Sequence, residues 1–214
     1  MADYSKLDHW SIKARKEGYP ARSVYKLKEM DEKFGLIPAG SSHLKILDLG
    51  SAPGSWSLYI LRKTAGRNKS LNDGTPGVTL VSVDLAPLSC MYDQGLFDRP
   101  EFFFIQGDFT LPGIQETIIS HGPYNLIASD AAPATTGNRS VDTSRSLGLA
   151  ETALDYSGNA LARGGNLVIK VFQGGDTSGM LKVMRSLFNT AKSYKPEACR
   201  AESFETYYLG LGRK

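Results

Sequence analysis

Residues 45–56 read Lys45-Ile46-Leu47-Asp48-Leu49-Gly50-Ser51-Ala52-Pro53-Gly54-Ser55-Trp56, and their pattern is the strongest indication of the fold. An apolar run of strand type leads into a tight turn, after which the pattern becomes helical. Gly50 and Gly54 carry no Cβ, so the backbone of the turn can approach a ligand closely. The free N–H groups at the start of the following helix face the same ligand. In open α/β folds such a turn opens a site for a nucleotide-type cofactor.

Strand-like and helix-like segments alternate along the rest of the chain. Strands are expected at 45–49, 78–83, 102–105, 124–129, 166–171 and 205–211, and helices near 54–65, 112–121, 142–163 and 176–191. This alternation predicts a mainly parallel sheet covered by helices on both faces. The last strand follows Lys195-Pro196 too closely for another crossover helix, so we expect it to pair antiparallel at the edge of the sheet. Residues 68–77 are polar and predict a loop insertion.

The N-terminal region differs from the rest of the chain in pattern and charge. Val24, Leu27, Met30 and Phe34 recur at spacings of three and four, which predicts an amphipathic helix. Residues 1–28 hold seven Lys/Arg and three Asp/Glu, a surplus of four, and the whole chain carries +3, so the remainder sums to −1. A basic arm on a near-neutral body fits contact with a polyanion. The alternative is a solvated helical face.

Length and composition place the chain among soluble globular proteins. With 214 residues, 41% hydrophobic and 22% charged, we expect one domain over 1–214, with a basic helical region at 1–40 and the sheet core at 45–214. The two cysteines, Cys90 and Cys199, cannot form a disulfide framework, which suits the cytoplasm. No apolar run approaches the roughly 20 residues that span a bilayer, and no signal peptide is recognisable. We expect a cytoplasmic monomer without membrane contact.

Acidic residues follow the predicted strands at their carboxyl ends. Asp84 stands where nucleotide-binding folds hold ribose hydroxyls, and Asp108 stands where a carboxylate can accept from an adenine amino group. Asp48 and Asp130 occupy similar places in two other strands. Ligands of open α/β sheets bind at this edge, so the four carboxylates are expected to converge. The alternative is that each caps a loop or the next helix.

Lys170 is unusual because it lies in the otherwise apolar strand 166–171. Lysine is rarely buried unless it is paired, and we expect its ammonium beside Asp130. Desolvation and a neighbouring carboxylate act on such an ammonium in opposite directions. That competition can make lysine a base or a hydrogen-bond donor near neutral pH. The alternative is a lysine that extends from the strand end into water.

The chain resembles the FtsJ/RrmJ family of RNA ribose 2′-O-methyltransferases over essentially its full length. The segments that carry the resemblance are 21–27, 48–57, 104–109, 129–133, 168–174 and 195–207. The D-x-G-x-x-P-G spacing of residues 48–54 resembles the first motif of S-adenosylmethionine-dependent methyltransferases and differs from the G-x-G-x-x-G of dinucleotide enzymes. The departures are Ser51 where alanine is common, Ser55 where a second glycine is common, and the 68–77 insertion.

The resemblance implies a fold, a cofactor and a set of site residues. The fold is a Rossmann-like α/β fold with a mostly parallel seven-stranded sheet, an antiparallel C-terminal strand and helices on both faces. The cofactor is S-adenosyl-L-methionine, and no metal is implied. The family's catalytic tetrad matches Lys26, Asp130, Lys170 and Glu205. The implied cofactor-binding residues are Gly50, Ser51, Pro53, Gly54, Trp56, Asp84, Asp108 and Asp130.

The resemblance also implies the reaction. It is 2′-O-methylation of the ribose of a uridine in large-subunit ribosomal RNA, with the tRNA anticodon loop as the alternative substrate. Lys170 would orient the hydroxyl and assist its deprotonation, Asp130 would steer that lysine, and Lys26 would flank the ribose together with Glu205.

The sequence fits two other classes of function less well. A nicotinamide-dependent oxidoreductase is disfavoured by Ala52-Pro53 in the glycine turn and by the C-terminal hairpin. A non-catalytic RNA-binding module is disfavoured by the complete tetrad.

Overall fold

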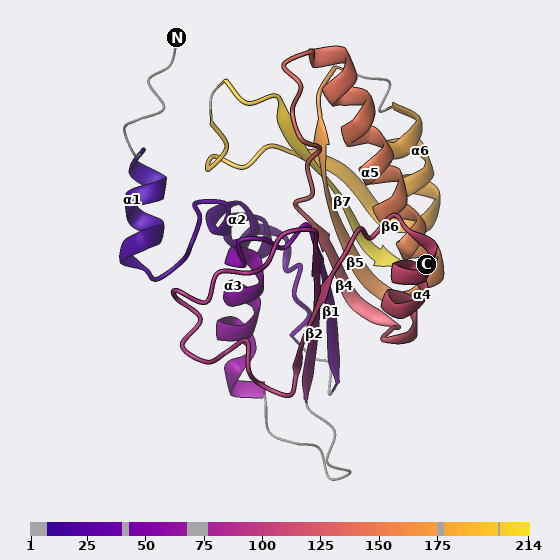
Figure 1. Cartoon of the computed structure of the whole chain (residues 1–214). Helices are drawn as coiled ribbons and strands as arrows, with labels where there is room; N and C mark the ends of the chain where they lie inside the picture. Colours follow the sequence, from indigo (N-terminus) through magenta and orange to yellow (C-terminus); the bar gives the residue numbers. More distant parts are fainter. Residues whose placement is uncertain (1–7, 40–42, 68–76, 175–177, 201) are drawn as a thin grey trace.

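A computed structural model describes residues 8–39, 43–67, 77–174, 178–200 and 202–214 (Figure 1). The elements are α1 (His9–Lys16), α2 (Val24–Phe34), β1 (Leu44–Leu49), α3 (Ser55–Thr64), η1 (Ala65–Arg67), β2 (Val78–Asp84), β3 (Phe102–Gln106), α4 (Pro112–Ser120), β4 (Tyr124–Ser129), α5 (Arg139–Asn159), β5 (Leu161–Phe172), α6 (Ser178–Leu187), β6 (Phe188–Tyr194) and β7 (Glu205–Arg213). The predicted loop insertion lies outside the described residues, apart from Gly77. None of the helices in the described ranges has the length and apolar character needed to cross a membrane.

The strands of the described chain form a seven-stranded sheet in the order β3-β2-β1-β4-β5-β7-β6. The strands β1 to β5 pair in parallel. The strand β7 runs antiparallel to both β5 and β6. The predicted fold class, a mostly parallel sheet with an antiparallel C-terminal strand, is confirmed.

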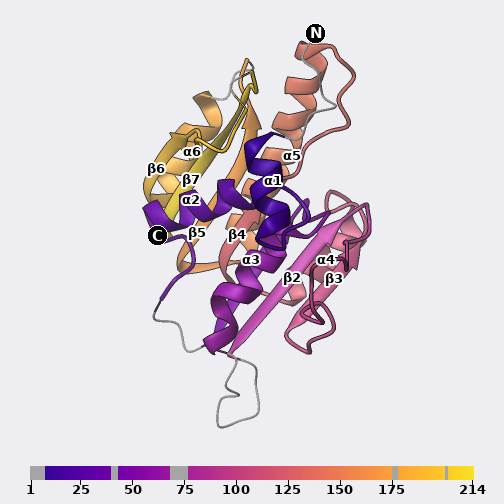
Figure 2. The same cartoon turned by 90° about the vertical axis from the view of Figure 1, so that its left-hand side faces the viewer.

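Neighbouring residues of the central strands face opposite sides of the sheet. Ile46 and Leu80 belong to a buried core that includes residues of α2 and α3. Leu47 and Val81 belong to a second core with residues of α4, α5 and α6. Figure 1 shows these helical layers on the two sides of the sheet, and Figure 2 views the layer of α1, α2 and α3 from outside. Burial of each such aliphatic side chain stabilises the fold by about 1.5–3 kcal/mol.

The C-terminal part of the sheet corrects two expectations. The helix expected at 176–191 ends at Leu187, because Phe188–Tyr194 is the edge strand β6. The last strand was expected at the sheet edge, but β7 lies between β5 and β6. The sequence of β6 is largely polar and partly exposed, so its hydrogen bonds to β7, the next strand along the chain, decide its conformation. A Cβ at Gly210 of β7 would lie 2.7 Å from the ring of Phe188, so glycine lets that ring pack there.

The junction between α5 and β5 also differs from the expectation. The helix expected at 142–163 ends at Asn159, and β5 begins at Leu161. The N–H of Ala160 closes the last helical turn on Tyr156 O at 2.8 Å, and Tyr124 N donates to Ala160 O at 2.7 Å. The pairing of β4 and β5 then shifts register.

The basic N-terminal region is tied to the C-terminal part of the chain. Asp8 caps α1 by accepting from Ser11 N at 2.9 Å. Its carboxylate also pairs with Arg22, and the same guanidinium donates to the backbone oxygen of Ala198. Arg200 Nε lies 3.7 Å from Asp8 Oδ2. These contacts place α1 beside the loop between β6 and β7.

Candidate active site

The turn after β1 is held by two glycines with positive φ. Gly50 has φ 72°, and a Cβ there would lie 2.5 Å from the Cα of Ala131 after β4. Gly54 has φ 107° and precedes α3, and its Cβ would lie 2.9 Å from the ring of Phe97. The N–H groups of Gly50 and Ser51 donate to Val83 O at 2.9 and 3.2 Å. Gly50 and Gly54 therefore both occupy positions where a side chain would not fit.

A cavity of about 580 Å³ opens beside this turn at the carboxyl ends of the strands. Four of the predicted cofactor residues line it, namely Gly50, Asp84, Asp108 and Asp130. Arg145 of α5 contributes a cationic side chain to the lining. The volume lies within the range of about 300–1,000 Å³ that is usual for small-molecule sites.

The other predicted cofactor residues, Ser51, Pro53, Gly54 and Trp56, are not part of this lining. Trp56 is buried, and its indole N–H donates to Ser23 O at 2.8 Å. Its ring lies against Tyr207, with 6.0 Å between the ring centroids. Trp56 therefore connects α3 to the start of α2 and to β7, and its contact with a cofactor stays a prediction.

Asp84 and Asp108 face the cavity and also organise its loops. Asp84 accepts from Ala52 N at 2.9 Å and from Ala86 N at 2.8 Å, one bond to each carboxylate oxygen. Asp108 Oδ1 accepts from Thr110 N at 2.9 Å and from Thr110 Oγ1 at 2.7 Å. A carboxylate has about four acceptor positions, so loop capping leaves room for ligand donors. The capping role and the ligand-binding role are compatible here.

The structure brings the four tetrad residues together as two ion pairs. Lys170 Nζ lies 3.1 Å from Asp130 Oδ1 and also donates to the backbone oxygen of Asp130. Lys26 Nζ lies 2.8 Å from Glu205 Oε1. Lys170 and Lys26 are only 8% and 9% exposed. The pairs join α2, β4, β5 and β7 at one end of the sheet.

The charges of this cluster depend on one another. Burial alone would raise the pKa of Asp130, but Lys170, Lys26 and a hydrogen bond from Tyr207 hold it below its usual value. Burial alone would lower the pKa of Lys26, but Asp130 and Glu205 raise it above its usual value. At neutral pH Asp130 is therefore a carboxylate and Lys26 an ammonium.

Two further side chains of the site were not found from the sequence. Tyr207 donates its hydroxyl to Asp130 Oδ1 at 2.6 Å and lies opposite Lys170 in the strand register. The signal that could have found it is its spacing of two from Glu205, which puts both on one face of a strand. Cys199 is buried near Glu205; burial first and that carboxylate second raise its pKa to about 12, so it stays a thiol. Nothing in the sequence pattern indicates its position.

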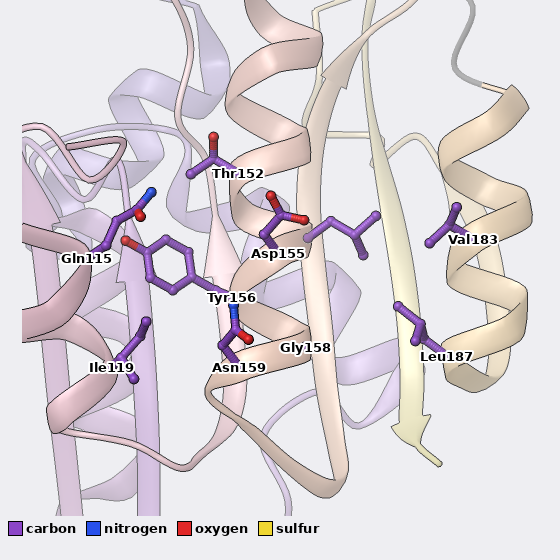
Figure 3. A pocket seen from close by; sticks show the side chains of 10 residues that line it. Gln115, Ile119, Thr152, Asp155, Tyr156, Gly158, Asn159, Val183 and Leu187 are labelled. Atoms are coloured by element: carbon purple, nitrogen blue, oxygen red, sulfur yellow. The ribbon is translucent and has the colours of Figure 1, made fainter. Parts of the chain in front are cut away.

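A second cavity lies between α4, α5 and α6, on the face of the sheet that is turned away from α2 and α3. It measures about 370 Å³ and contains none of the predicted site residues in its lining. Figure 3 shows Gln115 and Ile119 on one side of it, Asp155 in the middle, and Val183 with Leu187 on the other side.

Comparison with known proteins shows the family of the chain. A family model for FtsJ-like methyltransferases matches residues 19–213. The chain belongs to the FtsJ-like methyltransferase family. It is 49% identical over 212 residues to ribosomal RNA large subunit methyltransferase E of Treponema denticola, with 99% of this chain and 97% of that protein covered.

Solved structures show the same fold. A Plasmodium falciparum protein described as a ribosomal RNA methyltransferase superposes with a TM-score of 0.70 at 22% identity, covering 91% of this chain and 98% of that one. Human methyltransferase-like protein 13, in complex with SAH, superposes with a TM-score of 0.53 at 12% identity, covering 97% of this chain and 83% of that one. At these identities the likeness shows the fold alone.

Asp130 connects the two halves of the site in this FtsJ-like chain. Its carboxylate lines the cavity beside the glycine turn and pairs with Lys170 of the tetrad. A small molecule in the cavity and a second reactant at Lys170 would therefore meet at one carboxylate.

Proposed function

We propose that this FtsJ-like methyltransferase transfers a methyl group from S-adenosyl-L-methionine to the ribose 2′-hydroxyl of a uridine in large-subunit ribosomal RNA. The observation that carries the proposal is the double role of Asp130, which lines the cofactor-sized cavity and pairs with Lys170. The name of the Treponema denticola relative, ribosomal RNA large subunit methyltransferase E, supports the RNA substrate. A tRNA anticodon loop is the alternative substrate.

The residues around the cavity fit the cofactor. Asp84 and Asp108 offer acceptors for hydroxyl and amino donors such as those of an adenosine. Gly50 has no side chain, so the backbone there can approach these ligand groups closely. Asp130 adds a negative charge that suits a sulfonium. When bound, the cofactor supplies a methyl group on a positively charged sulfur.

The reaction needs positioning and the removal of one proton. The ribose 2′ oxygen attacks the methyl carbon in line with the carbon–sulfur bond. The oxygen–carbon bond forms, the electron pair of the broken bond stays on sulfur, and the hydroxyl loses its proton. The chain must therefore hold the oxygen in line and provide a group that interacts with this proton.

The contacts of Lys170 Nζ support a role in both tasks. Two of its hydrogen-bonding positions are taken by the backbone carbonyl oxygen and a carboxylate oxygen of Asp130. An ammonium then has one remaining N–H to orient the ribose oxygen, and an amine has its lone pair to accept the ribose proton. In either form Asp130 fixes the direction in which Nζ points.

The position and charge of the second ion pair support a role in holding the ribose. Lys26 comes from α2 and Glu205 from the start of β7, so the pair lies across the site from β4. Lys26 remains charged at neutral pH, since Asp130 and Glu205 outweigh the effect of its burial and raise its pKa. An ammonium and a carboxylate side by side can donate to and accept from neighbouring ribose hydroxyls.

The deciding experiment combines Lys170 variants with substrates that lack the target hydroxyl. Lys170→Ala should lower turnover by a factor of about 10²–10⁴, the usual contribution of proton-transfer assistance. Lys170→Arg should not restore it, because a guanidinium stays protonated and has another shape. Lys182→Ala on the exposed face of α6 is the matched control and should keep full turnover.

Substrates then test the acceptor. Purified large ribosomal subunits and bulk tRNA are compared, and the modified nucleotide is mapped. RNA with a 2′-deoxyribose at that nucleotide should bind but accept no methyl group. Methylation of the deoxy substrate, or near-normal turnover of Lys170→Ala, would refute the proposed chemistry. Preference for tRNA would refute the ribosomal substrate alone.

A further inference from the structure

A cluster of two aromatic rings and one guanidinium stands beside the tetrad and is not used by the mechanism above. Phe172 ends β5, Phe204 directly precedes β7, and Arg139 is the first residue of α5. The centroids of Phe172 and Phe204 lie 4.6 Å apart with the rings edge-on at 65°. The guanidinium carbon of Arg139 lies 5.4 Å from the centroid of Phe204. Three elements distant in sequence thus meet at one spot.

The strand register places this cluster next to the reacting groups. Phe172 pairs with Glu205, and Lys170 pairs with Tyr207. Paired residues and residues two apart point to the same face of a sheet, so Phe172 shares a face with Lys170 and Glu205. Phe204 adjoins Glu205 and packs on Phe172, which keeps it at the same strand ends.

Backbone contacts hold the cluster in place. Gln173 N donates to Phe204 O at 2.7 Å, which fixes the chain before β7 against the end of β5. Gly174 has φ 121°, and a Cβ there would lie 3.5 Å from Arg139 Nε, so the guanidinium passes close to this turn. The position of Arg139 at the start of α5 and that of Phe204 are therefore both defined by neighbouring backbone.

Exposure separates the members of the cluster. Phe172 is buried, Phe204 is half-buried and Arg139 is exposed. The buried ring supports the half-buried one, and the guanidinium lies on the solvent side. Aromatic rings and arginine planes are the surfaces on which unpaired RNA bases stack, and bases offered for chemistry are usually splayed out of their helix.

We propose that Phe204 and Arg139 form the stacking platform for the base of the acceptor nucleotide, with Phe172 as its support. The inference rests on the proposed function, because it requires a ribose held between Lys170 and Glu205. The base is attached to that same ribose and must extend out of the tetrad on one side. The cluster adjoins Glu205, so it lies beside the tetrad where such a base could stack. Stacking is tolerant of base identity, so the platform contributes to binding and position rather than to base choice.

The test is a cycle of Phe204 variants and abasic substrate. Phe204→Leu keeps an apolar contact with Phe172 but removes the stacking face, and Phe204→Trp keeps the face. With normal RNA, Phe204→Leu should raise KM by about 5- to 150-fold, the size of one base–aromatic stacking interaction, while Phe204→Trp stays near wild type. Phe103→Leu, an exposed phenylalanine on the edge strand β3, is the matched control. Affinity for S-adenosyl-L-methionine should not change in any of these variants.

The abasic arm separates stacking from support of the fold. An RNA whose target ribonucleotide lacks its base but keeps its 2′-hydroxyl should show the raised KM with wild-type protein. Phe204→Leu should add nothing further on that substrate. An equal loss for Phe204→Leu on both substrates, or no loss on normal RNA, would overturn the platform. Both results require active wild-type protein, so failure of the ribose-methylation proposal itself would show earlier, as absence of methyl transfer.

The role of Arg139 is tested by a variant that removes the planar guanidinium and keeps the positive charge. Arg139→Lys keeps the positive charge but loses the stacking plane. It should raise KM for normal RNA while leaving the salt dependence of RNA binding unchanged, because the number of displaced counterions is the same. A wild-type KM in Arg139→Lys would remove this residue from the platform.

Discussion

The hydroxyl of Tyr207 donates a 2.6 Å hydrogen bond to Oδ1 of Asp130, the oxygen that also lies 3.1 Å from Nζ of Lys170. One carboxylate oxygen thus receives a neutral donor from β7 and a lysine from β5. Burial by itself would raise the pKa of Asp130, and this hydrogen bond is one of the contacts that reverse the shift. Tyr207 is fully buried, so its hydroxyl has a fixed direction.

Tyr207→Phe should therefore reduce methyl transfer without unfolding the protein. The ring keeps its packing against Trp56, but Asp130 loses one donor and holds Lys170 less firmly. A hydrogen bond to a charged group contributes about 1.5–3 kcal/mol, so turnover should fall by about 10- to 150-fold. Tyr124→Phe is the control. Tyr124 is the first residue of β4, and its buried hydroxyl donates a 2.6 Å hydrogen bond to Ile118 O of α4, which this variant removes. Equal turnover in the two variants would argue against a role of Tyr207 in the site.

Asp84 should contribute to cofactor affinity more than to chemistry. Asp84→Ala removes the acceptors that face the cavity, which should weaken S-adenosyl-L-methionine binding by about 1.5–3 kcal/mol, as measured by calorimetry. Asp84→Asn keeps one acceptor oxygen and should lose less. Asp93→Ala is the control, because this carboxylate caps a neighbouring turn through Gly95 N at 3.2 Å and lies outside the cavity lining. Unchanged affinity in a folded Asp84→Ala protein would contradict the assignment.

The apolar strands and their acidic ends could be predicted because that information is local. The runs that became β1, β2 and β4 are buried on both faces, and the topology then brings Asp84, Asp108 and Asp130 to one cavity. The tetrad positions came from the resemblance, and Lys170 also stood out as a lysine in an apolar strand. Its position beside Asp130 follows from β4 and β5 being neighbours in the sheet.

The remaining features depend on contacts between distant residues. The strand β6 has a polar sequence, and only its pairing with β7 distinguishes it from a continuation of α6. Trp56 follows the glycine turn directly, yet its indole N–H turns away toward Ser23 O. Tyr207 becomes a partner of Asp130 only through the β5–β7 register. The first two relationships leave no periodic signal in the sequence, and the spacing of two between Glu205 and Tyr207 indicates a shared face of a strand but not the partner Asp130.

The exposed basic residues of α1 should contribute to RNA affinity through charge. Lys13 lies 4.8 Å from the ring centroid of Tyr25 and helps to dock α1, whereas Arg15 and Lys16 are exposed. Arg15→Gln with Lys16→Gln should weaken RNA binding and reduce the slope of log affinity against log salt by about 1.4–1.8 if both residues contact phosphate. Lys182→Gln with Arg185→Gln removes the same charge from α6 on the opposite face. Equal slopes for the two double variants would favour a solvated helical face at α1.

Asp48 should make the stability of the fold depend on pH. It is completely buried beneath the glycine turn, where Ser57 Oγ donates to Oδ2 at 2.7 Å. Within the described residues, Oδ1 has no hydrogen-bond partner. Burial, with smaller contributions from the charges of Asp130 and Asp84, raises the pKa of Asp48 to about 7 despite the opposing Ser57 bond.

A folded-state pKa above the unfolded value of about 3.9 means that the folded protein binds the proton more tightly. The stability that this proton supplies is fully present below pH 4 and is lost as the pH rises through about 7. Asp48→Asn keeps an acceptor for Ser57 but cannot ionise. Its free energy of unfolding relative to wild type should therefore increase between pH 5 and pH 8, by at most about 3 kcal/mol, because about two of the roughly three units of the shift lie above pH 5. Urea unfolding across this range measures the difference, with Asp98→Asn on the exposed surface as control. A difference between Asp48→Asn and wild type that stays constant with pH would show that Asp48 is already ionised in the folded protein at pH 5.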